Sequence, residues 1–439
     1  MSTMVTAEAV SGQPAKTRRR LIWLVAAVLA PVAGVLSLRG DQSLLVTDGA
    51  GTVARIDLRT GATEYTVSDA VPAPDRSRVY RTEVTEEATI LEELDPASGD
   101  VVGSTSLAGT LEIRAVSPYG GAVALMAPQT RSADLYVPEP REYTSINVVW
   151  DDDREARNYT LKGNFEPETF STDEGTLFLI EFFPPETPDR YYVRQLALDS
   201  GEVAPVAATE VELNPEMRGH ARAQVMAPDG RYLYSLYTMG AGEEPVHIAD
   251  AGGDSARWAF VHALNLKDKW SYCIFLPLPF GTGPESSISM AISGDGKDLY
   301  VVDSINDHIA EIDARRLFVK RIEELRGLET DGTAPPLAVG ERTIYVGMVG
   351  TVLEVERKTL IPSAAFVIGD DATNFSIRGL DLAPDGHTLR ISHATSISVV
   401  DMATEGIIAT LTSPGRGDTS FVGSSVGHRT DIDLTWVIP

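Results

Sequence analysis

Short runs of alternating apolar and polar residues, separated by turn-forming residues, recur along most of this chain. The clearest group lies between Phe375 and Gly415. It consists of four runs: Ser376 to Leu382, Thr388 to Ser392, Ile397 to Asp401 and Ile407 to Thr412. The first run ends at Pro384-Asp385-Gly386, a turn in which proline presets φ and glycine accepts a positive φ. The pattern predicts a four-stranded antiparallel meander of about forty residues.

Matching sets of second, third and fourth runs occur eight times. They begin near Ser43, Val79, Ala122, Thr176, Arg231, Lys297, Arg342 and Thr388. A sheet of this size cannot bury both faces alone, so the units must stack, and radial stacking gives a β-propeller. The sequence therefore predicts an all-β fold of eight four-stranded antiparallel blades. Seven blades are the alternative if the weakly patterned segment from Val71 to Gly109 forms no blade of its own.

The two ends of the repeat array indicate how the ring closes. The first unit begins at Ser43 with its second run and lacks a first run. Near the C-terminus, Asp431 to Val437 alternates like a first run and has no unit after it. We expect these two segments to pair, because closure removes the unpaired strand edges that an open array exposes.

A basic cluster and an apolar segment precede the repeats. Residues 1–20 lack periodicity, which predicts a disordered cytoplasmic tail that ends at Arg18-Arg19-Arg20. The uncharged segment from Leu21 to Leu38 would span about 27 Å as a helix, which predicts a single-pass transmembrane anchor in the cell membrane. Residues 39–42 then link the anchor to an extracytoplasmic propeller at 43–439. A signal peptide cleaved near Val32-Ala33-Gly34 is the alternative, whereas a buried helix is disfavoured by the adjacent arginines.

Composition narrows the classes of partner and chemistry. The net charge is −26, and residues 1–40 carry five basic groups against one acid, which leaves −30 for the remainder. Such a balance argues against nucleic acid and anionic lipid as partners of the propeller. The single cysteine, Cys273, excludes an internal disulfide and a cysteine zinc site. No catalytic motif, phosphate loop or histidine pair at ligand spacing is present, so we expect no bound cofactor and no metal.

Several motifs resemble one family of repeats. The Ala-Pro-Asp-Gly turns at 227–230 and 383–386, the strands Leu299 to Asp303 and Thr343 to Gly347, and Ile56-Asp57 before Thr60-Gly61 are similar to YVTN-type, WD-repeat-like β-propeller repeats. The resemblance covers about 43–439 and implies a scaffold at the bacterial cell surface or in the periplasm. It implies no particular chemistry, because the family has none in common.

Three long insertions are expected to gather on one face of the ring. They follow the second strand in three successive units: Ala127 to Thr144, Glu181 to Arg190, and Met239 to Ala259. Because the insertions hold aromatic residues such as Tyr143 and Trp258 on a rigid scaffold, they form a candidate binding surface. The alternative is tolerated loop growth that packs on itself.

Charged residues near the starts of the inner strands are expected to line a channel mouth on the same face. They are Glu112, Arg114, Glu168, His220, Arg222, Arg378 and Asp431. Carboxylates mixed with arginines can hold a polar ligand through bidentate contacts. The alternative is that these groups pair with one another around a wet channel.

Two functions are compatible with these features. The first is a non-catalytic binding or scaffold module for an extracytoplasmic protein or polysaccharide. The second is a propeller enzyme of lactonase or dehydrogenase type that uses the channel mouth. Because Ser43 begins a second strand only four residues after Leu38, the face with the Pro-Asp-Gly turns is expected to lie near the membrane and the insertions away from it.

Overall fold

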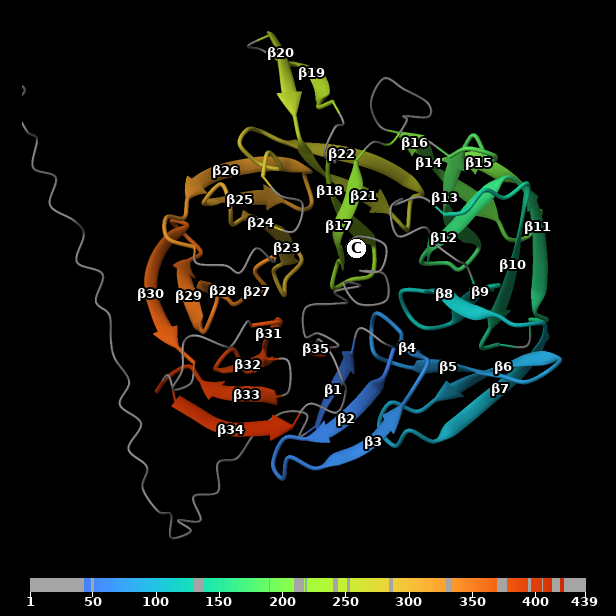
Figure 1. Ribbon diagram of the computed structural model, residues 1–439, viewed down its shortest axis with the longest axis horizontal. Helices are drawn as coiled ribbons and strands as arrows, with labels where there is room; N and C mark the ends of the chain where they lie inside the picture. The colour runs from blue at the N-terminus through green and yellow to red at the C-terminus, as the bar shows by residue number, and fades with distance from the viewer. Residues whose placement is uncertain are drawn as a thin grey trace, which may run out of the picture.

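The computed structural model arranges the strands as eight sheets around a central axis (Figure 1). It describes residues 43–48, 51–128, 138–152, 154–188, 190–208, 217, 219–239, 244–250, 253–283, 287–328, 334–368, 377–393, 396–404, 406–412 and 419–421. The fold is an eight-bladed β-propeller of antiparallel sheets, as the repeat pattern predicted. The segment from Val71 to Gly109 contributes a blade of its own, which excludes the seven-bladed alternative.

We number the blades along the chain. Blade 1 holds β1 (Ser43–Asp48), β2 (Val53–Asp57), β3 (Thr63–Val67) and β35 (Thr419–Phe421), and blade 2 holds β4 (Ala70–Pro72), β5 (Val79–Val84), β6 (Ala88–Leu94) and β7 (Val101–Ala108). Blade 3 holds β8 (Glu112–Val116), β9 (Ala122–Met126), β10 (Tyr143–Trp150) and β11 (Arg157–Lys162), and blade 4 holds β12 (Asn164–Phe170), β13 (Thr176–Phe183), β14 (Arg190–Ala197) and β15 (Val203–Pro205).

The second half of the ring follows the same plan. Blade 5 holds β17 (His220–Met226), β18 (Tyr232–Thr238), β21 (Ala259–Asn265), β22 (Trp270–Leu276) and an added edge strand, β16 (Ala207–Ala208). Blade 6 holds β23 (Ile288–Ile292), β24 (Asp298–Asp303), β25 (His308–Asp313) and β26 (Phe318–Glu324). Blade 7 holds β27 (Leu337–Val339), β28 (Thr343–Gly347), β29 (Thr351–Glu356) and β30 (Ile361–Val367), and blade 8 holds β31 (Gly379–Leu382), β32 (Thr388–Ser392), β33 (Ser396–Asp401) and β34 (Gly406–Thr412). A separate hairpin, β19 (Val246–Asp250) and β20 (Gly253–Arg257), projects beyond the outline of the ring (Figure 1).

A strand from the C-terminal part closes the ring, but it is not the predicted one. β35 pairs antiparallel with β1, with Val46 opposite Phe421, and so takes the inner position of blade 1. The expectation that Asp431 to Val437 fills this position was wrong, and that segment lies outside the described residues. Only six residues separate β34 from β35, a length within the range of the other connections between blades, which run from one residue at 163 to twelve at 325–336, so the nearer segment can take the inner position.

The hydrophobic core lies between blades rather than at one centre. Eight clusters of buried apolar residues each join two neighbouring blades, including the pair formed by blades 8 and 1. The middle strands bury side chains on both faces, as in β9, whose five residues are all buried. This double burial explains why several second runs are continuously apolar instead of alternating.

The ring has two different faces. First strands end and second strands begin on what we call the turn face, which also holds the connections from third to fourth strands. The opposite side, the loop face, holds the connections from second to third strands and those between blades. On the turn face, an acidic residue at the end of a third strand caps the following turn: Asp57 Oδ1 accepts from the backbone nitrogens of Arg59 at 2.7 Å and Thr60 at 2.9 Å.

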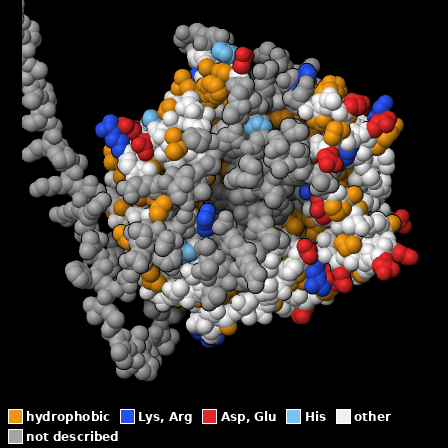
Figure 2. All heavy atoms as spheres, viewed as in Figure 1, with side chains coloured by type: hydrophobic (Ala, Val, Ile, Leu, Met, Phe, Trp, Pro, Cys, Tyr) orange, Lys and Arg blue, Asp and Glu red, His pale blue; other side chains and the backbone are white. Residues whose placement is uncertain are grey.

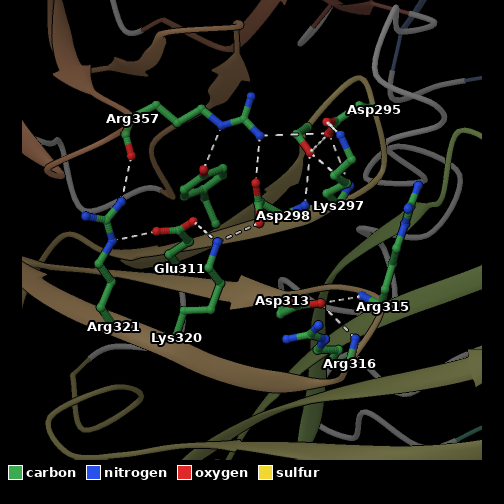
Figure 3. Close-up of polar contacts among 12 residues, drawn as sticks. Asp295, Lys297, Asp298, Glu311, Asp313, Arg315, Arg316, Lys320, Arg321 and Arg357 are labelled. Atoms are coloured by element: carbon green, nitrogen blue, oxygen red, sulfur yellow. Dashed lines mark hydrogen bonds and ion pairs between the residues drawn. The ribbon is translucent and has the colours of Figure 1, made fainter.

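A polar network joins blades 6 and 7 on the turn face (Figure 3). Arg357, which follows β29, donates to Tyr300 Oη at 2.8 Å and forms an ion pair with Asp298 at 2.8 Å. In return, Arg321 of β26 donates to the backbone oxygens of Arg357, at 2.7 Å, and Lys358. Because the side chains of Arg357 and Asp298 are only 18% and 16% exposed, their ion pair is largely shielded from water, and the network ties two blades together.

Candidate binding site

Three successive inner strands depart from regular pairing at a charged residue. In β8 the register with β9 skips Arg114, in β12 it skips Glu168, and in β17 it skips Arg222. Each is a β-bulge, a device that re-aims side chains and is frequent beside binding and active sites. The inner strands β23, β27 and β31 of blades 6, 7 and 8 pair with their neighbours without such a shift.

The other five blades place a bulge elsewhere. In blades 6, 7, 8, 1 and 2 the register shifts between the third and fourth strands, at the outer edge of the blade. Blades 3 and 5 have regular outer pairs. The ring therefore divides into two continuous arcs, and blades 3, 4 and 5 form the one whose inner strands are distorted.

The same three blades carry the long insertions, as the sequence predicted. These lie between β9 and β10, between β13 and β14, and between β18 and β21, where the third includes the β19–β20 hairpin. All three are on the loop face. Figure 2 shows the ring in the orientation of Figure 1, with charged side chains of both signs spread around its periphery.

A buried ionic cluster lies where blades 3 and 4 meet near the axis. The Arg114 guanidinium is 3.1 Å from Glu112 Oε1 and 3.3 Å from Glu166 Oε2, and Arg141 pairs with the other oxygen of Glu166. The Glu166 side chain is 2% exposed, whereas that of Glu112 is 40% exposed. A carboxylate shared by two guanidinium groups is held firmly in place. Each buried charge has lost its hydrogen bonds to water, and only the ion-pair partners replace them.

Arg141 connects the first insertion to this cluster. Its Nε donates to Asn164 Oδ1 at 2.8 Å and its backbone nitrogen donates to the Pro185 oxygen at 3.1 Å, so the insertion of blade 3 contacts both β12 and the insertion of blade 4. Burial lowers the pKa of the Arg141 guanidinium from its ordinary value, and the charge of Glu166 opposes that shift. The end of the insertion is therefore held against the inner rim, by which we mean the part of the ring formed by the inner strands β8, β12 and β17.

Glu168 takes part in a second polar group, between blades 4 and 5. The Gln224 amide donates to Glu168 Oε1 and, at 3.0 Å, to Ser235 Oγ. Gln224 lies on β17, two residues after the bulge at Arg222. Polar side chains thus continue along the inner rim from blade 3 to blade 5.

The structure brings together some of the sequence-predicted site residues. Glu112 begins β8 and His220 begins β17, and both are on the inner rim together with Glu168. Arg378 is exposed but precedes β31 of blade 8, on the opposite side of the ring from blade 4. Asp431 lies outside the described residues.

The two aromatic candidates do not join this rim. Tyr143 is 56% exposed, but it points to the side of β10 that faces blade 2, because Thr144 and Ile146 face blade 4. Trp258 is partly buried against the apolar cluster between blades 4 and 5. The Trp258 indole packs there because burial of its large apolar area is more favourable than exposure to water.

Sequence reasoning missed Arg141, Asn164 and Glu166. Glu166 precedes Glu168 by two residues in β12, so the alternation places both on the same side of the strand until the bulge separates them. That spacing was the available signal. For Arg141, at the end of an insertion, no periodicity applies.

The residues that the structure describes hold no group of three or more His, Cys, Asp and Glu side chains placed to bind a metal ion. They also contain no helix that is long and apolar enough to cross a membrane, and the predicted anchor at 21–38 lies outside them.

The fold defines the class, an eight-bladed β-propeller, and comparison with known proteins supports this class. No protein-family model matches the chain. No curated protein matches it in sequence.

Solved structures share the fold at low sequence identity. Dihydro-heme d1 dehydrogenase NirN in complex with DHE matches with a TM-score of 0.52 and 13% identity, over 88% of this chain and 76% of that one. AztD from Citrobacter koseri, in its apo form, matches with a TM-score of 0.51 and 12% identity, over 86% of this chain and 97% of that one. At such identities the likeness concerns the propeller fold alone.

Proposed function

We propose that this protein is a non-catalytic binding module whose partner docks on the loop face of blades 3, 4 and 5. One observation carries the proposal: inner-strand bulges and long insertions coincide in the same three successive blades. Both features depart from the regular repeat. Bulges and long loops that coincide in neighbouring blades are typical of a binding surface on a rigid scaffold.

Exposed apolar side chains on the same face favour a protein partner over a polysaccharide. Phe183 at the end of β13 is 43% exposed, and Leu278, after β22, is 55% exposed. Ile305 of blade 6 is 49% exposed and lies beside Gly283, which follows β22. Exposed aliphatic and aromatic side chains are typical of protein interfaces.

The cellular setting belongs to the same proposal. Residues 21–38 would anchor the chain in the cell membrane as a single-pass segment, with the propeller outside the cytoplasm. The full chain is then expected to stay in the membrane fraction through alkaline washing. A released protein with an N-terminus near Val35 would instead identify a cleaved signal. The YVTN-type resemblance is compatible with either outcome.

An enzyme is the second candidate. NirN, whose name describes a dehydrogenase, shows that an enzyme uses the same fold. An enzyme here would employ the inner rim, where Glu112, Glu168 and His220 lie. Metal analysis of the purified chain separates the two candidates, because a stoichiometric divalent ion bound there would favour the enzyme.

The binding function is tested by co-isolation from gently cross-linked cells. One variant carries Phe183→Ser and Leu278→Ser, and a matched control carries Val84→Ser and Val367→Ser. All four side chains are 43–55% exposed at the loop-face ends of strands or just after one, but the control pair lies on blades 2 and 7. We expect the first variant to lose its partner and the control to retain it. Equal recovery of the partner by both variants would contradict the proposal.

A further inference from the structure

Basic residues concentrate on the turn face of three blades. The turn-face connections of blades 5, 6 and 7 hold nine Lys and Arg against four Asp and Glu. The described turn-face connections of the other five blades hold four against eleven. In a chain with a net charge of −26, the first set is a local exception.

The excess survives when neighbouring strand residues are included. The flanking acids are Asp298, Glu311, Asp313, Glu354 and Glu356, and the flanking bases are Lys320 and Arg321. With these groups, eleven basic residues face nine acidic ones. The region therefore keeps a positive net charge even though its carboxylates contribute to the network in Figure 3.

Five of the cations are exposed and have no ion pair within the described part of the chain: Lys267, Arg315, Arg316, Arg342 and Lys358. Asp313 does not neutralise its neighbours through side-chain contacts, because its Oδ1 accepts from the backbone nitrogens of Arg315 at 3.0 Å and Arg316 at 2.8 Å. Figure 3 shows these two arginines on the capped turn.

Direct contacts make the three sets of turns one continuous surface, the basic turn surface. The backbone nitrogen of Ala314 donates to the Lys297 oxygen at 2.8 Å, and that of Arg357 donates to the Arg342 oxygen at 2.8 Å. Tyr234 Oη of blade 5 donates to the Ala314 oxygen at 2.6 Å. Arg321 joins blade 6 to blade 7 as described above.

Apolar side chains border the basic turn surface. Phe318, the first residue of β26, is 45% exposed, and Ile361, the first residue of β30, is 59% exposed. Both fourth strands begin on the turn face. Cations beside exposed apolar groups match the layered chemistry of a lipid headgroup region, in which anionic groups lie above hydrocarbon.

We propose that the basic turn surface rests on an anionic lipid bilayer. The chain enters the propeller at Ser43 on this same face, four residues after the apolar segment that ends at Leu38. The overall acidity predicts repulsion from anionic lipid, but salt screens charges beyond about 8 Å, so the nearest residues decide the interaction. This inference depends on the proposed membrane anchor at 21–38 for one point, namely which face of the propeller meets the membrane.

The test uses a propeller released after folding. A protease site is placed within residues 39–42 of the full chain, the protein is purified from membranes and cleaved, and the released part is incubated with vesicles. The vesicles are phosphatidylcholine alone or with about one-third phosphatidylglycerol. The patch variant carries Arg315→Gln, Arg316→Gln and Arg342→Gln. The matched control carries Arg59→Gln, Lys162→Gln and Arg326→Gln, which removes the same charge from exposed sites elsewhere.

We expect salt-sensitive rebinding to the anionic vesicles, weakened at least about tenfold in the patch variant and little changed in the control. Equal binding by the two variants, or no rebinding of the unmodified propeller, overturns the proposal. Tighter binding to a soluble polyanion such as heparin than to vesicles also overturns it. A chain that never fractionates with membranes before cleavage refutes the tether, which is a separate result.

Discussion

His262 lies in the apolar layer between blades 4 and 5 and is 4% exposed. The ring of Tyr237 meets it edge to face, with centroids 6.4 Å apart. Burial lowers the pKa of His262 to about 4, because the imidazolium would lose its water without gaining a partner. In the unfolded chain the same group titrates near 6.5.

This difference predicts an acid-sensitive fold. Between pH 6.5 and 4 the unfolded chain binds a proton that the folded protein does not, so the free energy of unfolding falls as the pH falls, by up to about 3 kcal/mol. Urea unfolding across this range measures it. His262→Leu should remove this part of the slope and leave the contribution of the carboxylates. An unchanged slope in the variant would assign the acid sensitivity to other groups.

Glu166 supports a second prediction at the residue scale. Glu166→Gln leaves the guanidinium groups of Arg114 and Arg141, whose side chains are only 11% and 17% exposed, without their buried carboxylate, and should cost roughly 3 kcal/mol of unfolding free energy. Glu112→Gln, at a carboxylate that is 40% exposed, is the matched control and should cost under about 1 kcal/mol. Chemical denaturation of both variants compares the two costs. Similar losses would show that the cluster is not held by its buried carboxylate.

At the scale of elements, the closing strand decides whether blade 1 is complete. A chain that ends at Phe421 keeps β35 and its pairing with β1, so it should melt close to the full chain. A chain that ends at Thr412 loses the inner strand of blade 1, reopens the ring and should melt well below it. Thermal melting of the two truncations tests this. A low melting temperature for the longer one would locate essential contacts beyond Phe421.

Much of the element pattern was predictable from the sequence. The starts of all eight second strands, the Pro-Asp-Gly turns and the three insertions follow from alternation and turn chemistry, which are local signals. β35 was not predictable, since three residues cannot display a period. The bulges could not be predicted either, because an extra residue is recognised only when the strand is compared with the strand that it pairs with. Hence Glu112 and Glu168 could be placed on the inner rim, but their actual partners Arg114 and Gln224 required the structure.

At the scale of the whole molecule, stability depends on contacts between blades. Arg357→Met removes the ion pair to Asp298 and the hydrogen bond to Tyr300 that join blades 7 and 6, and should cost roughly 3 kcal/mol. Arg59→Met is the control, because the Arg59 side chain is 69% exposed and 3.6 Å from its carboxylate partner, and it should cost under about 0.5 kcal/mol. Equal costs, measured by denaturant unfolding, would argue against a structural role for the network.

The two proposed contact surfaces lie on different parts of the ring. Blades 3, 4 and 5 carry the distorted inner strands and the insertions on the loop face, whereas the basic turn surface lies on the turn face of blades 5, 6 and 7. If the turn face meets the membrane, the loop face points away from it toward a partner. The central claim is therefore that the partner contacts one arc of one face.

Site-specific photo-crosslinking on intact cells tests this claim most directly. A photoreactive amino acid replaces, one at a time, Phe183 and Leu278 on the proposed arc and Val367 on the same face of blade 7. These three side chains are 43–55% exposed, so reactivity depends on the partner and not on accessibility. The account predicts a covalent adduct from each of the first two positions and none from Val367. An adduct from Val367, with none from Phe183 and Leu278, would contradict it.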